Sequence, residues 1–182
     1  MKINTNAGIT ILKFAKHMPN LKSFIHVSTM YANYHVDYIE ERFYSYRINH
    51  KELIMLTRNL SENEFEKKIS RIVSKWPNIY IFTKAIMEQF LKTESGNLPI
   101  GIFRPAVISP SASEPLVGWI DNYYGSISFV TAVLCGLTRF FGFNGDFNAN
   151  LVPVDFTANA LITSAWDVFN QCRYDQTHNL LS

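Results

Sequence analysis

The sequence predicts an α/β fold in which helices cover both faces of a parallel sheet. Segments with apolar residues at helical spacing alternate with short runs that are rich in β-branched and aromatic residues. Strands that alternate with helices favour parallel pairing, because each helix returns the chain to the edge where the previous strand began. At 182 residues the chain is long enough for one domain with a sizeable core. We therefore expect a doubly wound sheet within a single domain over residues 1–182.

The first predicted elements are a helix and a strand joined by a tight turn. The helix covers residues 4–18 and ends at Pro19-Asn20. Its predicted buried stripe consists of Ala7, Ile11, Phe14, Ala15 and Met18. The strand follows at residues 22–29, and we interpret His26 within it as a structural residue.

A long polar and aromatic connection runs from residue 31 to residue 78. Connections of this length are uncommon in compact domains unless they contain structure of their own. We expect a helical insertion at about residues 34–77, because Ser61 and Glu64 have the spacing of a capping box. Its predicted apolar stripe consists of Phe65, Ile69, Ile72 and Trp76.

The most informative segment is the predicted helix from Tyr80 to Leu91. Its predicted buried stripe consists of Phe82, Ile86, Met87, Phe90 and Leu91. Tyr80 and Lys84 are one turn apart, which places a phenol and an ammonium group on the same side. A neighbouring cation lowers the pKa of a tyrosine from its ordinary value of about 10. Such a tyrosine can exchange a proton with a carbonyl oxygen near neutral pH, although the same spacing occurs in many helices without function.

The second half of the chain predicts a further strand and two helices. The strand covers residues 100–105, and Pro105 ends its ladder because proline lacks an N–H donor. One helix is expected from about residue 126 to residue 140. The last helix follows residues 151–155, with Asp155 as its N-cap. Its predicted buried stripe consists of Ala158, Ile162, Ala165, Trp166 and Phe169.

Charge and composition exclude several classes of function. A net charge of +2 provides no broad basic surface for a nucleic acid. Cys135 and Cys172 have no spacing that suits a metal site, so we expect no metal and interpret both as buried thiols of a reducing compartment. The most apolar run, at residues 127–137, is far shorter than the roughly 20 residues that span a membrane.

Three segments are expected to meet at one edge of the predicted sheet. Ser28 and Thr29 follow the first strand, the helix of Tyr80 begins at the same edge, and residues 105–110 follow the second strand. Doubly wound folds bind their ligands outside the carboxyl ends of the strands. This expected convergence favours a functional interpretation of Tyr80 and Lys84.

Several groups of residues form an ordered set of motifs. They are HVSTMYAN at 26–33, PNIYIFTKA at 77–85, RPAVI at 104–108, EP with GWIDN at 114–122, and LVPVD with NA at 151–160. Together with Asn4, they resemble the extended short-chain dehydrogenases/reductases, and more narrowly the fatty acyl-CoA reductases that form fatty alcohols. The resemblance extends from Asn4 to about Trp166.

The resemblance implies a Rossmann-like domain of which this chain is the C-terminal portion. The family begins with a strand and a glycine-rich turn that holds the cofactor pyrophosphate. This sequence has eight glycines, none of them in that spacing. The family also carries a second, C-terminal domain. We therefore expect a fragment that lacks the first βαβ unit and is inactive by itself.

The resemblance also implies roles for individual residues. Tyr80 would donate a proton to the carbonyl oxygen while NADPH delivers hydride to the carbon. Lys84 would hold the nicotinamide ribose hydroxyls and keep the pKa of Tyr80 low. Thr29, with Ser28 as second choice, would hydrogen-bond the same carbonyl oxygen. Asn4 would position a water or backbone group near Lys84, and it suits a helix N-cap equally well.

The implied ligands are NADPH and a long-chain fatty acyl-CoA, which the family reduces to a fatty alcohol. The backbone at Pro105, Ala106, Val107 and Ile108 would wall the nicotinamide. The resemblance further implies an intracellular protein that associates with peroxisomal or endoplasmic reticulum membranes through parts outside this chain. Two alternatives remain: another extended dehydrogenase/reductase acting on a sugar nucleotide or steroid, and a non-catalytic remnant that binds a partner or lipid. The long insertion argues against the first alternative, because sugar-nucleotide members usually have a shorter connection there.

We predict that this chain alone binds NADPH weakly or not at all. The backbone donors of a glycine-rich turn cannot be replaced by any later motif. Fluorescence titration of the purified chain measures the affinity, and a dissociation constant in the micromolar range or below contradicts the prediction.

Overall fold

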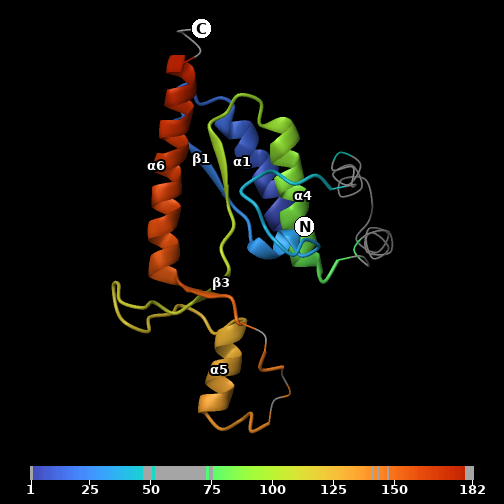
Figure 1. The fold of residues 1–182 in the computed structure, drawn as a ribbon, viewed down its shortest axis with the longest axis vertical. Helices are drawn as coiled ribbons and strands as arrows, with labels where there is room; N and C mark the ends of the chain where they lie inside the picture. Colours follow the sequence, from blue (N-terminus) through green and yellow to red (C-terminus); the bar gives the residue numbers. More distant parts are fainter. Residues whose placement is uncertain are drawn as a thin grey trace. The chain divides into compact units, whose positions relative to one another are not determined.

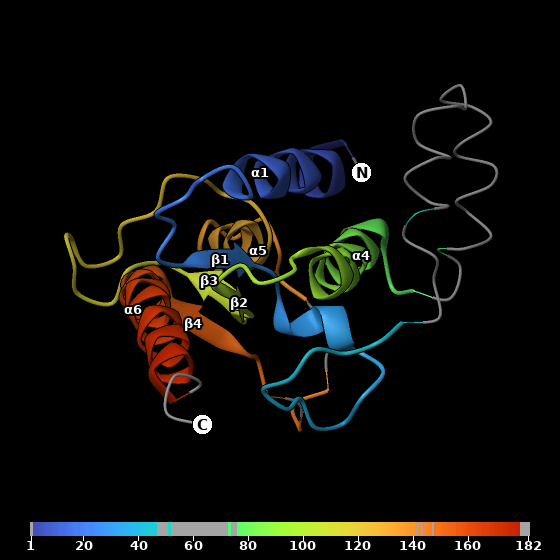
Figure 2. The ribbon, with the colours of Figure 1, turned by 90° about the horizontal axis from the view of Figure 1, so that it is seen from above.

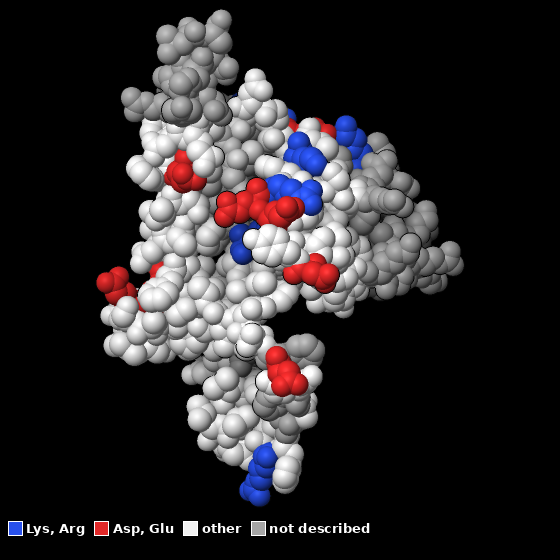
Figure 3. Space-filling model, in the orientation of Figure 1, with Lys and Arg blue, Asp and Glu red and all other residues white. Residues whose placement is uncertain are grey.

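The computed structural model describes residues 2–46, 51, 73, 76–140, 142, 144–146 and 148–178. The chain divides into two compact units. The first unit contains residues 1–104 and 164–182, and the second contains residues 105–163. On the face shown in Figure 3, acidic and basic side chains are interspersed rather than gathered into a broad area of one sign.

The first unit contains a pair of parallel strands covered by helices. Its elements are η1 (Lys2–Ala7), α1 (Gly8–Ala15), β1 (Phe24–Val27), η2 (Met30–Asn33), α4 (Ile79–Glu94), β2 (Ile100–Phe103) and the C-terminal part of α6 (Val154–His178). β1 and β2 pair in parallel with Phe24 opposite Ile100 and Val27 opposite Phe103. Helices α1 and α4 lie side by side next to these strands (Figures 1 and 2).

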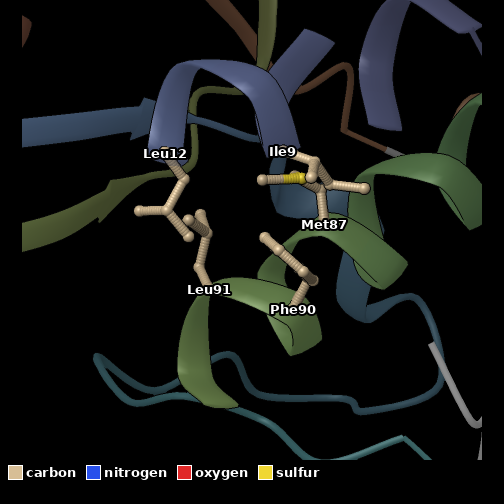
Figure 4. Packing of buried hydrophobic residues seen from close by; sticks show 5 residues of the cluster. All are labelled: Ile9, Leu12, Met87, Phe90 and Leu91. Atoms are coloured by element: carbon tan, nitrogen blue, oxygen red, sulfur yellow. The ribbon is translucent and has the colours of Figure 1, made fainter. Parts of the chain in front are cut away.

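The core of the first unit lies between α1 and α4. Ile9 and Leu12 of α1 point toward Met87, Phe90 and Leu91 of α4 (Figure 4). The partly buried side chains of Phe24, Leu98 and Ile100 pack against this cluster. Because full burial of each large apolar side chain contributes about 1.5–3 kcal/mol, this cluster anchors α4 to the strands.

The predicted buried stripe of α4 is confirmed, whereas the helix, at Ile79–Glu94, is longer at both ends than the predicted range from Tyr80 to Leu91. The helix begins after Asn78, whose side chain accepts a hydrogen bond from the backbone N–H of Ile81 at 2.9 Å. All five predicted stripe residues are buried, with Phe82, Ile86 and Leu91 fully enclosed.

The predicted stripe of the first helix is largely wrong. Phe14 is 66% exposed, and Ile11 and Met18 are exposed as well. The buried face consists of Ile9, Leu12 and Ala15. Two apolar rows run along this helix, and spacing alone cannot tell which row faces a partner. Gly8 selects the buried row, because Met87 lies only 2.8 Å from the position a Cβ would occupy there.

The second unit contains its own parallel pair of strands. Its elements are β3 (Val107–Ser109), α5 (Ser126–Leu134), β4 (Leu151–Pro153) and the N-terminal part of α6. β3 and β4 pair with Val107 opposite Leu151. The predicted combination of helices with parallel strands is confirmed. The predicted single doubly wound sheet is not, since the described residues form two separate two-stranded sheets. The predicted strand over residues 100–105 is too long, because β2 ends at Phe103, two residues before Pro105.

Two predictions about the last helix are wrong. Asp155 is the second residue of α6 and not its N-cap. Its buried carboxylate instead accepts hydrogen bonds from the backbone N–H groups of Ala112, Ser113 and Glu114, at 2.9–3.2 Å. Burial opposes ionisation, but these bonds hold the pKa of the Asp155 carboxyl well below its ordinary value.

The predicted apolar stripe of α6 is also mostly exposed. Ala158, Ile162 and Trp166 are exposed, while Ala165 and Phe169 are only partly buried.

Other sequence predictions have different outcomes. The predicted capping box and the stripe residues Phe65, Ile69 and Ile72 lie outside the described residues. Cys135 is exposed and Cys172 only partly buried, so the prediction of two buried thiols is wrong. Within the described ranges, no helix is long and apolar enough to cross a bilayer.

We predict that Gly101→Ala destabilises the first unit by about 1–3 kcal/mol. A Cβ at Gly101 would lie 2.7 Å from Cγ2 of Val168 on α6 and 3.0 Å from Cδ1 of Ile25. Valine is held in one side-chain rotamer within a helix and cannot turn away. Denaturant unfolding of Gly101→Ala, Val168→Ala and the double variant measures the effect. The prediction fails if Gly101→Ala costs as much in the Val168→Ala background as in the parent.

Candidate active site

Helix α4 brings Tyr80 and Lys84 to the carboxyl end of β1. The Lys84 ammonium donates a hydrogen bond to the backbone carbonyl of Val27 at 2.9 Å. The same nitrogen lies 5.8 Å from the centroid of the Tyr80 ring, so the two side chains share one side of the helix as predicted. Tyr80 is 49% exposed, and its hydroxyl has no hydrogen-bond partner among the described residues. This hydroxyl is therefore available to a ligand.

The predicted lowering of the Tyr80 pKa is wrong in this structure. Burial raises the pKa of the phenol above its ordinary value. The Lys84 ammonium lies 5.8 Å from the centroid of the Tyr80 ring, and its charge does not outweigh the effect of burial. Burial in turn lowers the pKa of Lys84, and the negative charge of Glu88 opposes that shift. The phenol is thus fully protonated at neutral pH.

The two hydroxyl residues after β1 have different partners. Ser28 is buried, and its hydroxyl donates a 2.5 Å hydrogen bond to Oε1 of Glu88. Thr29 is also buried, and its oxygen accepts a long, 3.4 Å contact from the backbone N–H of Tyr31 at the start of η2. Ser28 is therefore already committed as a donor, whereas the Thr29 hydroxyl acts only as an acceptor within the part of the chain that the structure describes.

Asn4 lies inside the π-helix η1, so its interpretation as a helix N-cap is wrong. Its side-chain amide donates to the hydroxyl of Thr83 at 3.1 Å. That hydroxyl donates to the backbone carbonyl of Tyr80 at 2.8 Å. Through these two bonds, the π-helical η1 connects Asn4 to the backbone of the first turn of α4. Such π-helical turns are rare in proteins overall, but where they occur they often lie at functional sites. Its role toward a water near Lys84 stays a prediction.

The sequence analysis missed a buried ion pair beside these residues. Glu88 is 1% exposed and accepts hydrogen bonds from Nε of Arg104 at 3.1 and 3.2 Å and from Nη2 at 2.8 Å. A sequence signal was present, because Glu88 falls among the buried positions Ala85, Met87 and Leu91. A charge at such a position needs a partner inside the protein.

His26 of β1 is partly buried near Lys84. Burial, assisted by the charge of Lys84, lowers the pKa of its imidazole to about 4. Its Nε2 is buried without a hydrogen-bond partner in the described part of the chain. The imidazole is therefore neutral at physiological pH, in keeping with the structural interpretation.

The remaining predicted site residues belong to the second unit. Pro105 and Ala106 precede β3, and Val107 and Ile108 lie within it. Their role as a wall for the nicotinamide stays a prediction. A separate cavity of about 510 Å³ in the first unit is lined by residues that include Ile25, Gly101 and Val168, and neither Tyr80 nor Lys84 lines it. No cluster of metal-ligating side chains occurs among the described residues.

We predict that the free energy of unfolding falls by about 2 kcal/mol between pH 7 and pH 5 because of His26. The unfolded histidine, with a pKa near 6.5, takes up a proton in this interval, whereas the folded one, with a pKa of about 4, does not. Stability is therefore lost as the pH falls. Denaturant titrations at both pH values should show a smaller loss for His26→Phe and an unchanged loss for His17→Phe, which removes an exposed histidine. A parental loss in His26→Phe contradicts the prediction.

Comparison with known proteins bears directly on this site. Three curated relatives are "Fatty acyl-CoA reductase wat" of Drosophila melanogaster, 38% identical, "Fatty acyl-CoA reductase 1" of Xenopus laevis, 34% identical, and "Fatty acyl-CoA reductase 2" of Homo sapiens, 32% identical. Each match extends over 166 residues, which is 91% of this chain and 32% of the relative. The chain thus spans about a third of the length of these relatives. The resemblance to fatty acyl-CoA reductases is confirmed.

A family model of NAD-binding domains agrees with these relatives. The model, described as male sterility protein, matches residues 1–161, which include every predicted site residue. Since the match covers well over half of the chain, the protein belongs to the male sterility protein family.

Proposed function

We propose that this chain is the proton-donating part of an NADPH-dependent reductase that converts long-chain fatty acyl-CoA to fatty alcohol. The observation that carries the proposal is the arrangement of Tyr80 and Lys84 at the carboxyl end of β1. Ligands of parallel α/β folds bind outside the carboxyl ends of strands. The names of the relatives supply the substrate class, and the family supplies the nicotinamide cofactor.

The donor set at Lys84 fits the ribose of a nicotinamide cofactor. An ammonium group has three N–H donors, and one of them is directed to the carbonyl of Val27. Two donors remain for the ribose hydroxyls, and the side chain is only half-buried. When bound, the cofactor supplies hydride to the substrate carbon. The reduced form, NADPH, is our specific proposal.

Tyr80 is suited to supply the proton that balances this reduction. As a carbonyl carbon gains hydride, its oxygen becomes negative and needs a proton. The raised pKa of Tyr80 keeps the phenol protonated at neutral pH, so its O–H is ready to be transferred. The nearby Lys84 ammonium then stabilises the phenolate that remains. The chemistry thus needs a protonated phenol at the start, which is the state that burial favours.

Thr29 is the better candidate for a second hydrogen bond to the substrate oxygen. Its hydroxyl serves only as an acceptor for the backbone of Tyr31, so its proton is free to be donated. The proton of Ser28 is donated to Glu88. We therefore assign oxyanion stabilisation to Thr29 alone.

We predict that Tyr80→Phe lowers acyl-CoA reduction by roughly 10²-fold or more. The substitution removes the transferable proton and keeps the ring. The measurement uses a chimera in which this chain replaces the matching segment of the Drosophila melanogaster relative, with NADPH oxidation followed in the presence of a long-chain acyl-CoA. Lys84→Met should reduce turnover similarly and weaken NADPH binding.

Tyr38→Phe is the matched control, because Tyr38 is an exposed tyrosine of the same unit and should leave turnover unchanged. Parental turnover in the Tyr80→Phe chimera contradicts the mechanism. Turnover with a sugar nucleotide but not with acyl-CoA would favour the alternative reductase, and an inactive parental chimera would favour the non-catalytic remnant.

A further inference from the structure

Three chemically active side chains follow one another along a single face of α4. Tyr80, Lys84 and Glu88 are separated by four residues each, so each lies one helical turn from the next. Tyr80 is half exposed, Lys84 is partly buried and Glu88 is fully buried. The row therefore begins at the surface and ends inside the protein.

Lys84 and Glu88 bind consecutive residues of the strand end. The Lys84 ammonium donates to the carbonyl of Val27, and the Glu88 carboxylate accepts from the hydroxyl of Ser28. Two side chains of α4 thus fix the last residue of β1 and the residue that follows it. Thr29 comes directly after these two, so its position depends on the same pair of contacts.

The Glu88 carboxylate connects two further segments through Arg104. The guanidinium of Arg104, at the end of β2, donates to both carboxylate oxygens. Its Nη2 also donates to the backbone carbonyl of Arg42, and its guanidinium lies 5.6 Å from the centroid of the Tyr44 ring. An unpaired buried carboxylate is strongly unfavourable, and the ion pair with Arg104 compensates for the burial of Glu88. This ion-paired carboxylate belongs to the residue one turn away from Lys84.

We propose that Glu88 is a positioning residue for Lys84. Glu88 keeps the lysine charged and holds the Val27–Ser28 strand end against it. The inference rests on the proposed function, in which Lys84 holds the cofactor and stabilises the Tyr80 phenolate. Among the described residues, the charged or titratable groups near Lys84 are Glu88 and Tyr80 from α4 and His26 from β1. His26 is neutral at physiological pH, so Glu88 is the group that supports the ammonium against burial.

The test measures the titration of Lys84 in the complete chain without cofactor or substrate. Acetic anhydride labels the lysine only when its amine is deprotonated, and mass spectrometry of the peptide that contains Lys84 reports the labelling at each pH. Glu88→Gln keeps an acceptor for Ser28 and removes the charge. We expect its labelling curve to move down by about one pH unit, which is about a 10-fold faster labelling at pH values below both midpoints.

Matched variants separate the charge from other effects. Glu94→Gln removes a carboxylate at the far end of the same helix, where it pairs with Lys51, and should leave the curve in place. Ser28→Ala removes the hydrogen bond to Glu88 but keeps its charge, so it should move the curve much less than Glu88→Gln. An unchanged Lys84 curve in folded Glu88→Gln overturns the proposal.

Because Glu88→Gln leaves Arg104 unpaired and can unfold the chain, a second variant decides in that case. Glu88→Met with Arg104→Met replaces the pair by apolar side chains, an exchange that proteins often tolerate. We expect a cooperative melt and a Lys84 curve that is still shifted downward. An unshifted curve, or a loss of cooperative melting, overturns the proposal, because the pair would then hold the fold rather than the lysine. The labelling requires no turnover, so it can fail independently of the chimera experiment.

Discussion

The packing of α4 against α1 and the β1–β2 pair is the interaction on which the first unit depends. One side of this helix supplies Met87, Phe90 and Leu91 to the core. The same helix presents Tyr80 and Lys84 at the strand end. Because the core fixes the rotation of α4 about its axis, the direction of both candidate site residues follows from apolar burial. The stability of the core and the geometry of the site therefore have a common origin.

Sequence reasoning was most accurate where local pattern and tertiary packing agree. The stripe of α4 has a single apolar row, and the structure buries that row. The helix of Ile11 and Phe14 has two such rows, and the choice between them is made by a close approach at Gly8 that no periodicity contains. The stripe of α6 failed for a related reason, because Ile162 and Trp166 are apolar but exposed. Apolar spacing identifies a helix more reliably than it identifies the buried face.

The sequence motifs indicated candidate members of the site but not the contacts that these residues make. The order of motifs placed Tyr80, Lys84, Ser28 and Thr29 in one family, and the family match includes all of them. Glu88 was missed because a glutamate in a helix usually lies on a solvated face, and only the distant partner Arg104 makes its burial favourable. The direction of the Tyr80 pKa was wrong because spacing places a cation nearby but does not show that burial of the phenol outweighs its charge.

The contact between Lys84 and the carbonyl of Val27 has unequal requirements at its two ends. The acceptor belongs to the main chain, so it is present whatever side chain occupies position 27. The donor is a side chain, and among the common residues only a long cation reaches the strand end from α4 in this way. Substitutions at position 27 are therefore limited only by strand geometry and packing, whereas substitutions at position 84 are limited by the need for a long side chain that donates a hydrogen bond. Among tolerated substitutions, this contact would therefore strongly limit the residues found at position 84 and would hardly limit those found at position 27.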